Sequence, residues 1–288
     1  MRGERDVLWD LVVKCDDICF TRILPRLNRT DLKFLHEVNT ETRKLIKRST
    51  REGELKKKFK VNEMSSISTL EVALENKSLW PSVWDKSSFS NRVAETNKLE
   101  FLKWAREVKQ CEWDEWPINT AAAKGNLEML KYCFSNDCPC DEKKACKHAA
   151  AGGNLDCLRF LFDQVEPSRG TEEEAAQQAA GMGHTDILRY FVEERKISED
   201  AEAKITCVAT AAKFGRLDSL KYLVEEAKVL LDSWVYVAYA RYHEHADCLN
   251  YLLEKGSPEP TEEHHARVTA FLDNQKKQNP SSQHHNDA

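Results

Sequence analysis

Apolar and polar positions repeat in one order through the middle of the chain. Residues 121–132 read Ala-Ala-Ala-Lys-Gly-Asn-Leu-Glu-Met-Leu-Lys-Tyr, and three similar segments follow, at 149–160, 179–190 and 211–222. The acid of this pattern recurs every 28 to 32 residues, at Glu128, Asp156, Asp186 and Asp218. A steady period of this length is typical of repeat proteins, so the pattern predicts an all-α solenoid in which each unit packs on its neighbours.

Each copy predicts two helices joined by a turn. The first helix is rich in alanine, which allows close stacking, and a glycine follows it in four copies: Gly125, Gly153, Gly183 and Gly215. Glycine adopts the left-handed conformation that ends a helix without a Cβ clash. The second helix begins with Leu-Asp or Leu-Glu, where the acid suits the positive end of the helix dipole. The Leu and the aromatic residue two and four positions later should face inward, and the basic residue between them outward.

The array extends beyond the clear copies. Glu71, Glu100 and Asp247 continue the spacing of the acids, so we expect about six repeats and a partial first one over residues 67–256. In the last repeat Glu244 occupies the glycine position. The proline-rich break at 256–260 should end the repeats, with a C-terminal helix or cap over 257–273. The following residues, 274–288, have few apolar side chains and are expected to be disordered.

The first 66 residues do not follow the repeat. Apolar residues at helical spacing predict a small helical head over 1–49, in which Pro25 kinks a helix and Thr30 or Asp31 caps the next one. Residues 50–66 are expected to form a basic connector. The run from Arg43 to Lys60 has nine Lys or Arg and two Glu. It is either an anion-binding or nuclear-localisation patch or the solvated face of a connecting helix.

Composition narrows the classes of partner. The chain is 41% hydrophobic and 32% charged, and its net charge of −5 leaves the repeats strongly acidic once the basic run is set apart. This charge argues against nucleic acid as their partner. No apolar run approaches the roughly 20 residues of a membrane-spanning helix, and the N-terminal segment lacks the apolar region of a secretory signal. We therefore expect an intracellular monomer, cytoplasmic or nuclear, whose ten cysteines are reduced thiols.

No constellation of side chains indicates catalysis. Six residues are candidate zinc ligands by type: Cys133, Cys138, Cys140, Cys146, His148 and Cys157. The repeat register distributes them over different faces, and no pair of Cys-x-x-Cys motifs is present. Nothing brings a nucleophile, a base and an orienting acid together, and no glycine-rich phosphate loop occurs. We expect no metal, no cofactor and no enzymatic activity, with an enzyme of cryptic site as the remote alternative.

The repeats resemble ankyrin repeats. Residues 116–122, Trp-Pro-Ile-Asn-Thr-Ala-Ala, correspond to the first motif of that family, and the Gly-x-Leu-Asp/Glu segments to the second. The linkers 111–115 and 138–142 are similar to the Cys-Pro-Trp-Asp-Glu linker of a divergent class in unicellular eukaryotes and large DNA viruses. The resemblance implies binding of a protein partner on the concave face made by the first helices and the linker tips before them. The variable residues there are the candidate contacts: Trp113, Trp116, Asn119, Lys143, Lys147, Gln177, Gln178, Thr206, Thr210, Tyr236 and Tyr239.

Tryptophans are concentrated at the start of the repeats, at positions 80, 84, 104, 113 and 116. They either pack under the linkers or form an aromatic hot spot for a partner.

The head resembles an F-box, a short helical segment that binds a Skp-type adaptor of cullin–RING ubiquitin ligases. The resemblance assigns adaptor-facing or core contacts to five residues: Ile23, Leu24, Leu27, Leu32 and Val38. Cys15-Asp16 replace the usual Leu-Pro opening, and Thr42 stands where an aromatic residue is usual. In this reading the chain is a substrate receptor that links a target protein to the ligase. The alternatives are a plain interaction scaffold and a head that only caps the first repeat.

Overall fold

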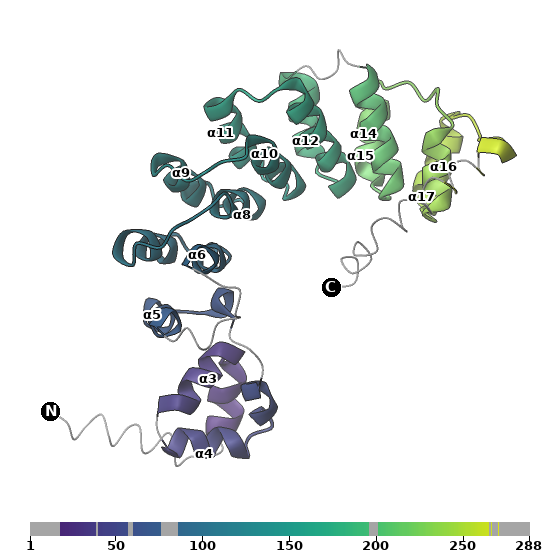
Figure 1. Ribbon diagram of the computed structural model, residues 1–288. Coiled ribbons are helices and arrows are strands. Elements are labelled where there is room, and N and C mark those ends of the chain that lie inside the picture. The colour runs from purple at the N-terminus through teal and green to yellow at the C-terminus, as the bar shows by residue number, and fades with distance from the viewer. Residues whose placement is uncertain are drawn as a thin grey trace. The chain divides into compact units, whose positions relative to one another are not determined.

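The structure is a computed structural model that describes residues 18–38, 40–56, 60–75, 86–195, 201–264, 266 and 270. Every regular element in these residues is a helix, which confirms the predicted all-α class (Figure 1). Labels with η denote short 3-10 or π helices. Contacts divide the chain into two units. Unit 1 contains the described residues up to Ala121 together with Glu128–Cys140, and unit 2 contains Ala122–Leu127 and the described residues from Asp141 onward.

Unit 1 begins with a small helical head. Its elements are η1 (Cys19–Ile23), η2 (Leu24–Arg26), α3 (Arg29–Val38), α4 (Thr40–Arg48), η3 (Glu52–Lys56) and η4 (Val61–Glu63). Three side chains form its core, Leu24, Leu32 and Ile46, and the partly buried Phe20, Leu27 and Leu35 pack against them.

The described part of the expected connector is folded onto this head. Arg51 donates to the carbonyl oxygens of Leu24 and Leu27, the latter at 2.8 Å, so the guanidinium satisfies carbonyls at the end of η2. The amide of Asn28 donates to the carbonyl of Glu63 at 2.7 Å, which holds η4 against the start of α3. Residues 57–59, which include two lysines of the basic run, lie outside the described part. The basic run therefore contains at least one cation with an internal structural role.

The helices of the repeats follow in the predicted order. Those before the second unit are α5 (Ile67–Glu75), α6 (Lys86–Ala94), α7 (Leu99–Lys103) continued by the π helix η6 (Trp104–Val108), α8 (Trp116–Lys124) and α9 (Leu127–Ser135). The boundary between the units passes through α8 and α9.

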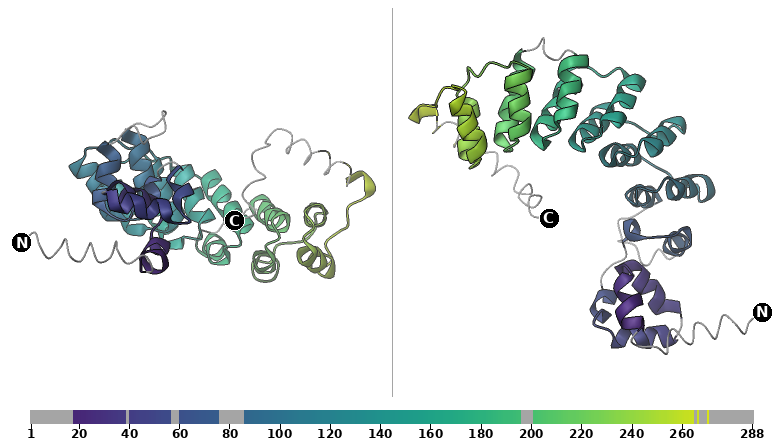
Figure 2. Two further views of the ribbon diagram at one scale, coloured as in Figure 1. Left: turned by 90° about the horizontal axis from the view of Figure 1, so that it is seen from below. Right: turned by 180° about the vertical axis from the view of Figure 1, so that it is seen from behind.

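Unit 2 consists of four helix pairs. They are α10 (Glu142–Ala151) with α11 (Leu155–Val165), α12 (Arg169–Met182) with α13 (Thr185–Arg189) and η7 (Tyr190–Glu194), α14 (Ala201–Lys213) with α15 (Leu217–Lys221) and η9 (Tyr222–Glu226), and α16 (Val235–Tyr242) with α17 (Ala246–Glu254). The first helices pack in sequence, α10 on α12, α12 on α14 and α14 on α16. Each first helix also packs on the second helix of its own pair. Seen nearly end-on, the helices of the last two pairs form two rows (Figure 2).

The turn inside each repeat has the same backbone conformation. Six residues at the equivalent position have positive φ, between 61° and 90°: Asn97, Gly125, Gly153, Gly183, Gly215 and Glu244. The four glycines adopt this left-handed conformation without a Cβ penalty, as the sequence predicted. Asn97 and Glu244 adopt it in the outer repeats, although they are not glycine. We call this position the left-handed residue and use it as the register mark of each repeat.

The side chain after the left-handed residue joins neighbouring repeats in unit 2. Each of these side chains donates to the carbonyl two positions before the left-handed residue of the preceding repeat. The four joints are Asn154 to Ala123 (2.9 Å), His184 to Ala151 (3.0 Å), Arg216 to Gly181 (2.9 Å) and His245 to Lys213 (3.0 Å). Carbonyls at the end of a helix lack partners within the helix. Each joint therefore satisfies such a group and couples two repeats.

The described C-terminal segment folds back on the last repeat. The ring of His264 stacks on Trp234 with 4.0 Å between centroids, and Arg241 pairs with Glu259 at 3.0 Å. These contacts lie within residues 257–273, for which the sequence predicts a C-terminal helix or cap. Among the described residues, no helix is both long and apolar enough to cross a membrane.

Candidate functional site

Within each unit, three positions of each first helix form an exposed surface. They lie nine, five and one residues before the left-handed residue, and a spacing of four places them on one side of an α-helix. In unit 2 the side chains at these positions are exposed or half-buried: Lys144, His148, Glu174, Gln178, Met182, Thr206, Thr210, Phe214, Val235, Tyr239 and His243. In unit 1, Ser88, Arg92 and Trp116 hold the same register, while Thr120 is buried. We call this surface the repeat face.

Five of the predicted partner contacts lie on the repeat face: Trp116, Gln178, Thr206, Thr210 and Tyr239. Lys143, Lys147 and Gln177 lie beside it, one position away in the register. The hydroxyls of Thr206 and Thr210 donate to carbonyls of their own helix, both at 2.8 Å. These two residues therefore offer a partner their methyl groups and an acceptor oxygen rather than a hydroxyl donor.

Two predicted contacts are buried, so they present no surface to a partner. Tyr236 and Asn119 both belong to the interior. Tyr236 lies eight residues before the left-handed residue, in a column whose other members are buried too: Phe89, Pro117, Ala145, Ala175 and Cys207. None of these members is charged, which was the signal in the sequence that this column faces inward. Burial raises the pKa of Tyr236 to about 12.

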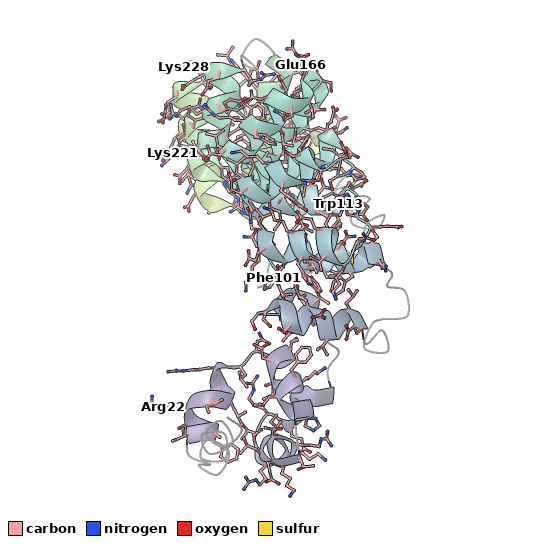
Figure 3. All side chains as sticks on the ribbon, turned by 90° about the vertical axis from the view of Figure 1, so that its left-hand side faces the viewer. Arg22, Phe101, Trp113, Glu166, Lys221 and Lys228 are labelled. Carbon is pink, nitrogen blue, oxygen red and sulfur yellow. The ribbon has the colours of Figure 1, made fainter. Side chains whose placement is uncertain are left out.

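Trp113 packs away from the repeat face, among residues of the second helices. The guanidinium of Arg106 lies 4.7 Å from the Trp113 ring centroid, and Tyr132 contacts the ring edge-on at 6.1 Å between centroids. Figure 3 labels Trp113 among the side chains of the repeats. Its half-buried ring supports packing under the linker, as does the buried Trp104. Trp80 and Trp84 lie outside the described residues.

The repeat face also carries two apolar side chains that the sequence reading missed. Met182 and Phe214 are 45% and 46% exposed, each directly before a left-handed glycine. The Phe214 ring lies over Gly181, where a Cβ atom would come within 3.1 Å of it. The recurring position before the glycine, which is Lys124, Gly152, Met182 and Phe214 in successive copies, was the available signal.

Charges on the first helices of unit 2 are partly compensated. Three successive glutamates of α12 have basic partners: Glu172 with Arg195, Glu173 with Arg169 at 3.2 Å, and Glu174 with Lys143 at 2.6 Å. Lys147 has no carboxylate partner in the described part of the chain. Desolvation lowers the pKa of His148, and the charges of Lys147 and Lys144 lower it further. Lys144, on the repeat face, is paired with Asp141 at 3.3 Å, so the uncompensated positive charge of α10 is that of Lys147, beside the repeat face.

A small pocket opens on the repeat face of unit 1. It has a volume of about 180 Å³ and is lined by Ser88, Asn91, Arg92 and Trp116. Trp116 is 47% exposed. The carboxylate of Asp114 holds both walls, because it accepts from the Trp116 backbone N–H at 2.7 Å and from the Asn91 amide at 3.0 Å.

The cysteines show one arrangement that the register did not predict. Cys133 and Cys138 were expected on different faces, but both are buried, and the backbone N–H of Cys138 donates to the carbonyl of Cys133 at 3.0 Å. The Cys138 Sγ donates to the carbonyl of Asp114 at 3.2 Å. The neighbouring Cys133 thiol and burial raise the pKa of Cys138. The nine cysteines that the structure describes are free thiols. Within the same residues, no group of three or more His, Cys, Asp or Glu is arranged to hold a metal ion.

The predicted adaptor contacts of the head divide into core and surface. Leu24 and Leu32 are buried in the head core, so they cannot face an adaptor directly. Ile23 and Leu27 are half-buried, and the side chain of Val38 lies outside the described part. Ile18, which the sequence reading did not select, is 48% exposed.

The chain was compared with models of known protein families and with curated protein sequences. Models of known protein families give no match to the chain, and curated protein sequences give none either.

Proposed function

We propose that residues 67–256 form ankyrin-type repeats that bind a protein partner on the repeat face and catalyse no reaction. The observation that carries this proposal is the contrast between columns of the first helices. Positions that face neighbouring repeats are mostly small and apolar. Positions on the repeat face change from Lys and His on α10 to Gln and Met on α12, Thr and Phe on α14, and Tyr on α16. A constant interior with a varied exposed surface is the arrangement of a recognition module.

The chemistry of the repeat face also suits a protein partner. Exposed Met182 and Phe214 and half-buried Tyr239 supply apolar and aromatic area, and residues of these types are enriched in the centres of interfaces. Gln178 lies one helical turn before Met182 and adds an amide with both donor and acceptor groups. Such a mixture favours contact with a folded protein or an extended peptide.

Photo-crosslinking with the full chain tests this proposal. A crosslinking amino acid at Gln178 on α12 should capture the partner, whereas the same group at Lys221, an exposed residue of the second helix α15, should not. Met182→Ser should reduce the Gln178 crosslink, since it removes apolar contact area. Equal capture from both positions would contradict binding on the repeat face, and absence of any crosslink from the first helices would contradict the function.

We also propose, as a second function, that the head binds a Skp-type adaptor. The observation in its favour is the exposed Ile18 beside the half-buried Ile23, on a head whose core is closed by other residues. Purified adaptor should bind the full chain, and Ile18→Asp and Ile23→Asp should abolish binding without unfolding the head. Val108→Asp, at an exposed apolar residue outside the head, is the matched control. Failure of the intact chain to bind adaptor would leave the head as a cap of the first repeat.

A further inference from the structure

We propose that the pocket at Trp116 binds a positively charged side chain, arginine or lysine, of the protein partner. This inference depends on the proposed function, because it assigns one partner side chain to the repeat face of unit 1. The pocket is formed by Ser88, Asn91 and Arg92 of α6 and Trp116 at the start of α8, with a volume of about 180 Å³.

The aromatic wall of the pocket is suited to a cation. A tryptophan ring attracts an ammonium or guanidinium group over its face more strongly than tyrosine or phenylalanine does. Other aromatic rings of the chain already have such partners within the protein: Lys103 lies over Tyr132, and Arg106 lies over Trp113. Trp116 has no basic side chain over its ring in the described part of the chain, and nearly half of its surface is exposed.

The polar wall contains a buried acceptor, the Oδ1 atom of Asn91. The Nδ2 atom of Asn91 donates to Asp114, so the hydrogen bond fixes which way the amide points. Its Oδ1 atom then faces away from Asp114 and has no hydrogen-bond partner in the described residues. A guanidinium or ammonium group carries only donors, so it would satisfy this oxygen.

The charges around the pocket favour the same ligand. Arg92, the one cation in the lining, is paired with Glu95. Asp114 has no ion-pair partner among the described residues, although its carboxylate holds both walls. The charged residues of α6, of the turn 95–97 after it and of the linker 109–115 are four acids and three bases: Glu95, Glu112, Asp114 and Glu115 against Lys86, Arg92 and Lys109. Lys109 is paired with Glu71 outside this group. The remaining negative charge attracts a cationic side chain and repels a carboxylate.

Small probes separate this inference from the proposed function, because they need no partner. The full chain is titrated with N-acetyl-arginine amide and N-acetyl-lysine amide, and with their neutral counterparts N-acetyl-citrulline amide and N-acetyl-norleucine amide. NMR follows the indole N–H signal of Trp116, assigned from its loss in Trp116→Leu. We expect both cationic probes to shift this signal at concentrations about tenfold lower than their neutral counterparts, a ratio equivalent to roughly 1.4 kcal/mol. The Trp113 signal should stay in place.

Two variants change the pocket in opposite directions. Trp116→Leu keeps an apolar side chain but removes the ring, so it should abolish the difference between arginine and citrulline probes. Arg92→Gln removes a positive charge, so it should tighten binding of the cationic probes severalfold and leave citrulline unchanged. Trp113→Phe is the control that should alter neither, and thermal unfolding verifies that each variant is folded.

Three outcomes would overturn the inference. They are equal binding of arginine and citrulline, tighter binding of N-acetyl-glutamate amide than of the arginine probe, and cation binding that persists in Trp116→Leu. None of these affects the crosslinking result at Gln178, which lies in the other unit and tests the proposed function by itself.

Discussion

The left-handed residue shows what the backbone requires at a single position. Glycine meets the requirement in four repeats, but Asn97 and Glu244 adopt the same conformation at φ values of 62° and 61°. The sequence therefore allowed the conformation to be predicted where glycine occurs, whereas for Glu244 the aligned acids indicated only that it occupies the glycine position. The neighbours of each glycine could not be predicted, because they belong to the next repeat.

Gly215 and Gly256 both have positive φ but differ in their surroundings, so substituting each by alanine distinguishes backbone strain from steric collision. A Cβ atom at Gly215 would lie 2.7 Å from Nδ1 of His245, whereas at Gly256 it would meet nothing within 4 Å. Alanine at either position bears the left-handed cost of about 1–2 kcal/mol. We therefore expect Gly215→Ala to lower the free energy of unfolding by more than Gly256→Ala, as measured by urea denaturation. Equal losses would mean that His245 moves aside freely.

The imidazole of His148 provides a test at the same scale. Its pKa in the folded chain is lowered by desolvation and by Lys147 and Lys144, from an unfolded value of about 6.5. The folded state then binds the proton less readily, so the free energy of unfolding should fall as pH decreases below the unfolded pKa and level off below the folded one. Lys147→Gln should raise the pKa of His148 and weaken this dependence. NMR titration of the imidazole measures the pKa, and the free energy of unfolding at several pH values measures the dependence. A folded-state pKa at or above the unfolded value would contradict the assignment.

At the scale of helices, the structure adds joints to the predicted helix pairs. The order of helices, the alanine-rich first helix and the acid at the start of the second helix follow from periodicity and helix capping, and could be predicted. The joints could not, because Asn154, His184, Arg216 and His245 share no side-chain type. They share only the acceptor of their hydrogen bond, a carbonyl at one position of the preceding repeat. This acceptor can be identified only from the arrangement of the helices.

Removing one joint should uncouple neighbouring repeats. His184→Ala deletes the bond to the carbonyl of Ala151, and a hydrogen bond of this kind contributes about 0.5–1.5 kcal/mol, with a further cost for the buried carbonyl it leaves. Because the stability of repeat proteins depends on such interfaces, the urea transition should also broaden. Lys131→Ala is the control, since its exposed pair with Glu128 lies within one helix and contributes at most about 1 kcal/mol. An unchanged, sharp transition in His184→Ala would show that packing alone couples the repeats.

At the scale of the whole molecule, prediction succeeded where physical periodicity is strong and failed where single side chains decide. The helical class and the helix pairs were predictable, and so was the exposed register that includes Trp116 and Gln178. The folding of the connector was not, because it depends on one guanidinium, that of Arg51, reaching two distant carbonyls. The hydrogen bond from the Cys138 Sγ to the carbonyl of Asp114 depends in the same way on the turn that follows α9.

Truncation tests the cap at the end of the chain. A chain that ends at Lys255 loses the ring stacked on Trp234, the pair between Arg241 and Glu259, and the bond from Ser257 to the carbonyl of Ser233. We expect this chain to be less stable by about 1–3 kcal/mol and to expose Trp234 to acrylamide quenching. A chain that ends at residue 273 keeps all three contacts, so its thermal midpoint should match that of the full chain. Equal midpoints for both truncations would contradict a capping role.

The joints of unit 2 have a mechanical consequence. Each connects a side chain of one repeat to a single carbonyl of the repeat before it, so tension applied at the chain end loads them in series. The helices should therefore detach one pair at a time, starting from the last, and each detachment should release about 30 residues, or roughly 100 Å of extended chain. Under load, unit 2 should therefore extend in discrete steps, and the force of the weakest step should depend on one amide, imidazole or guanidinium group.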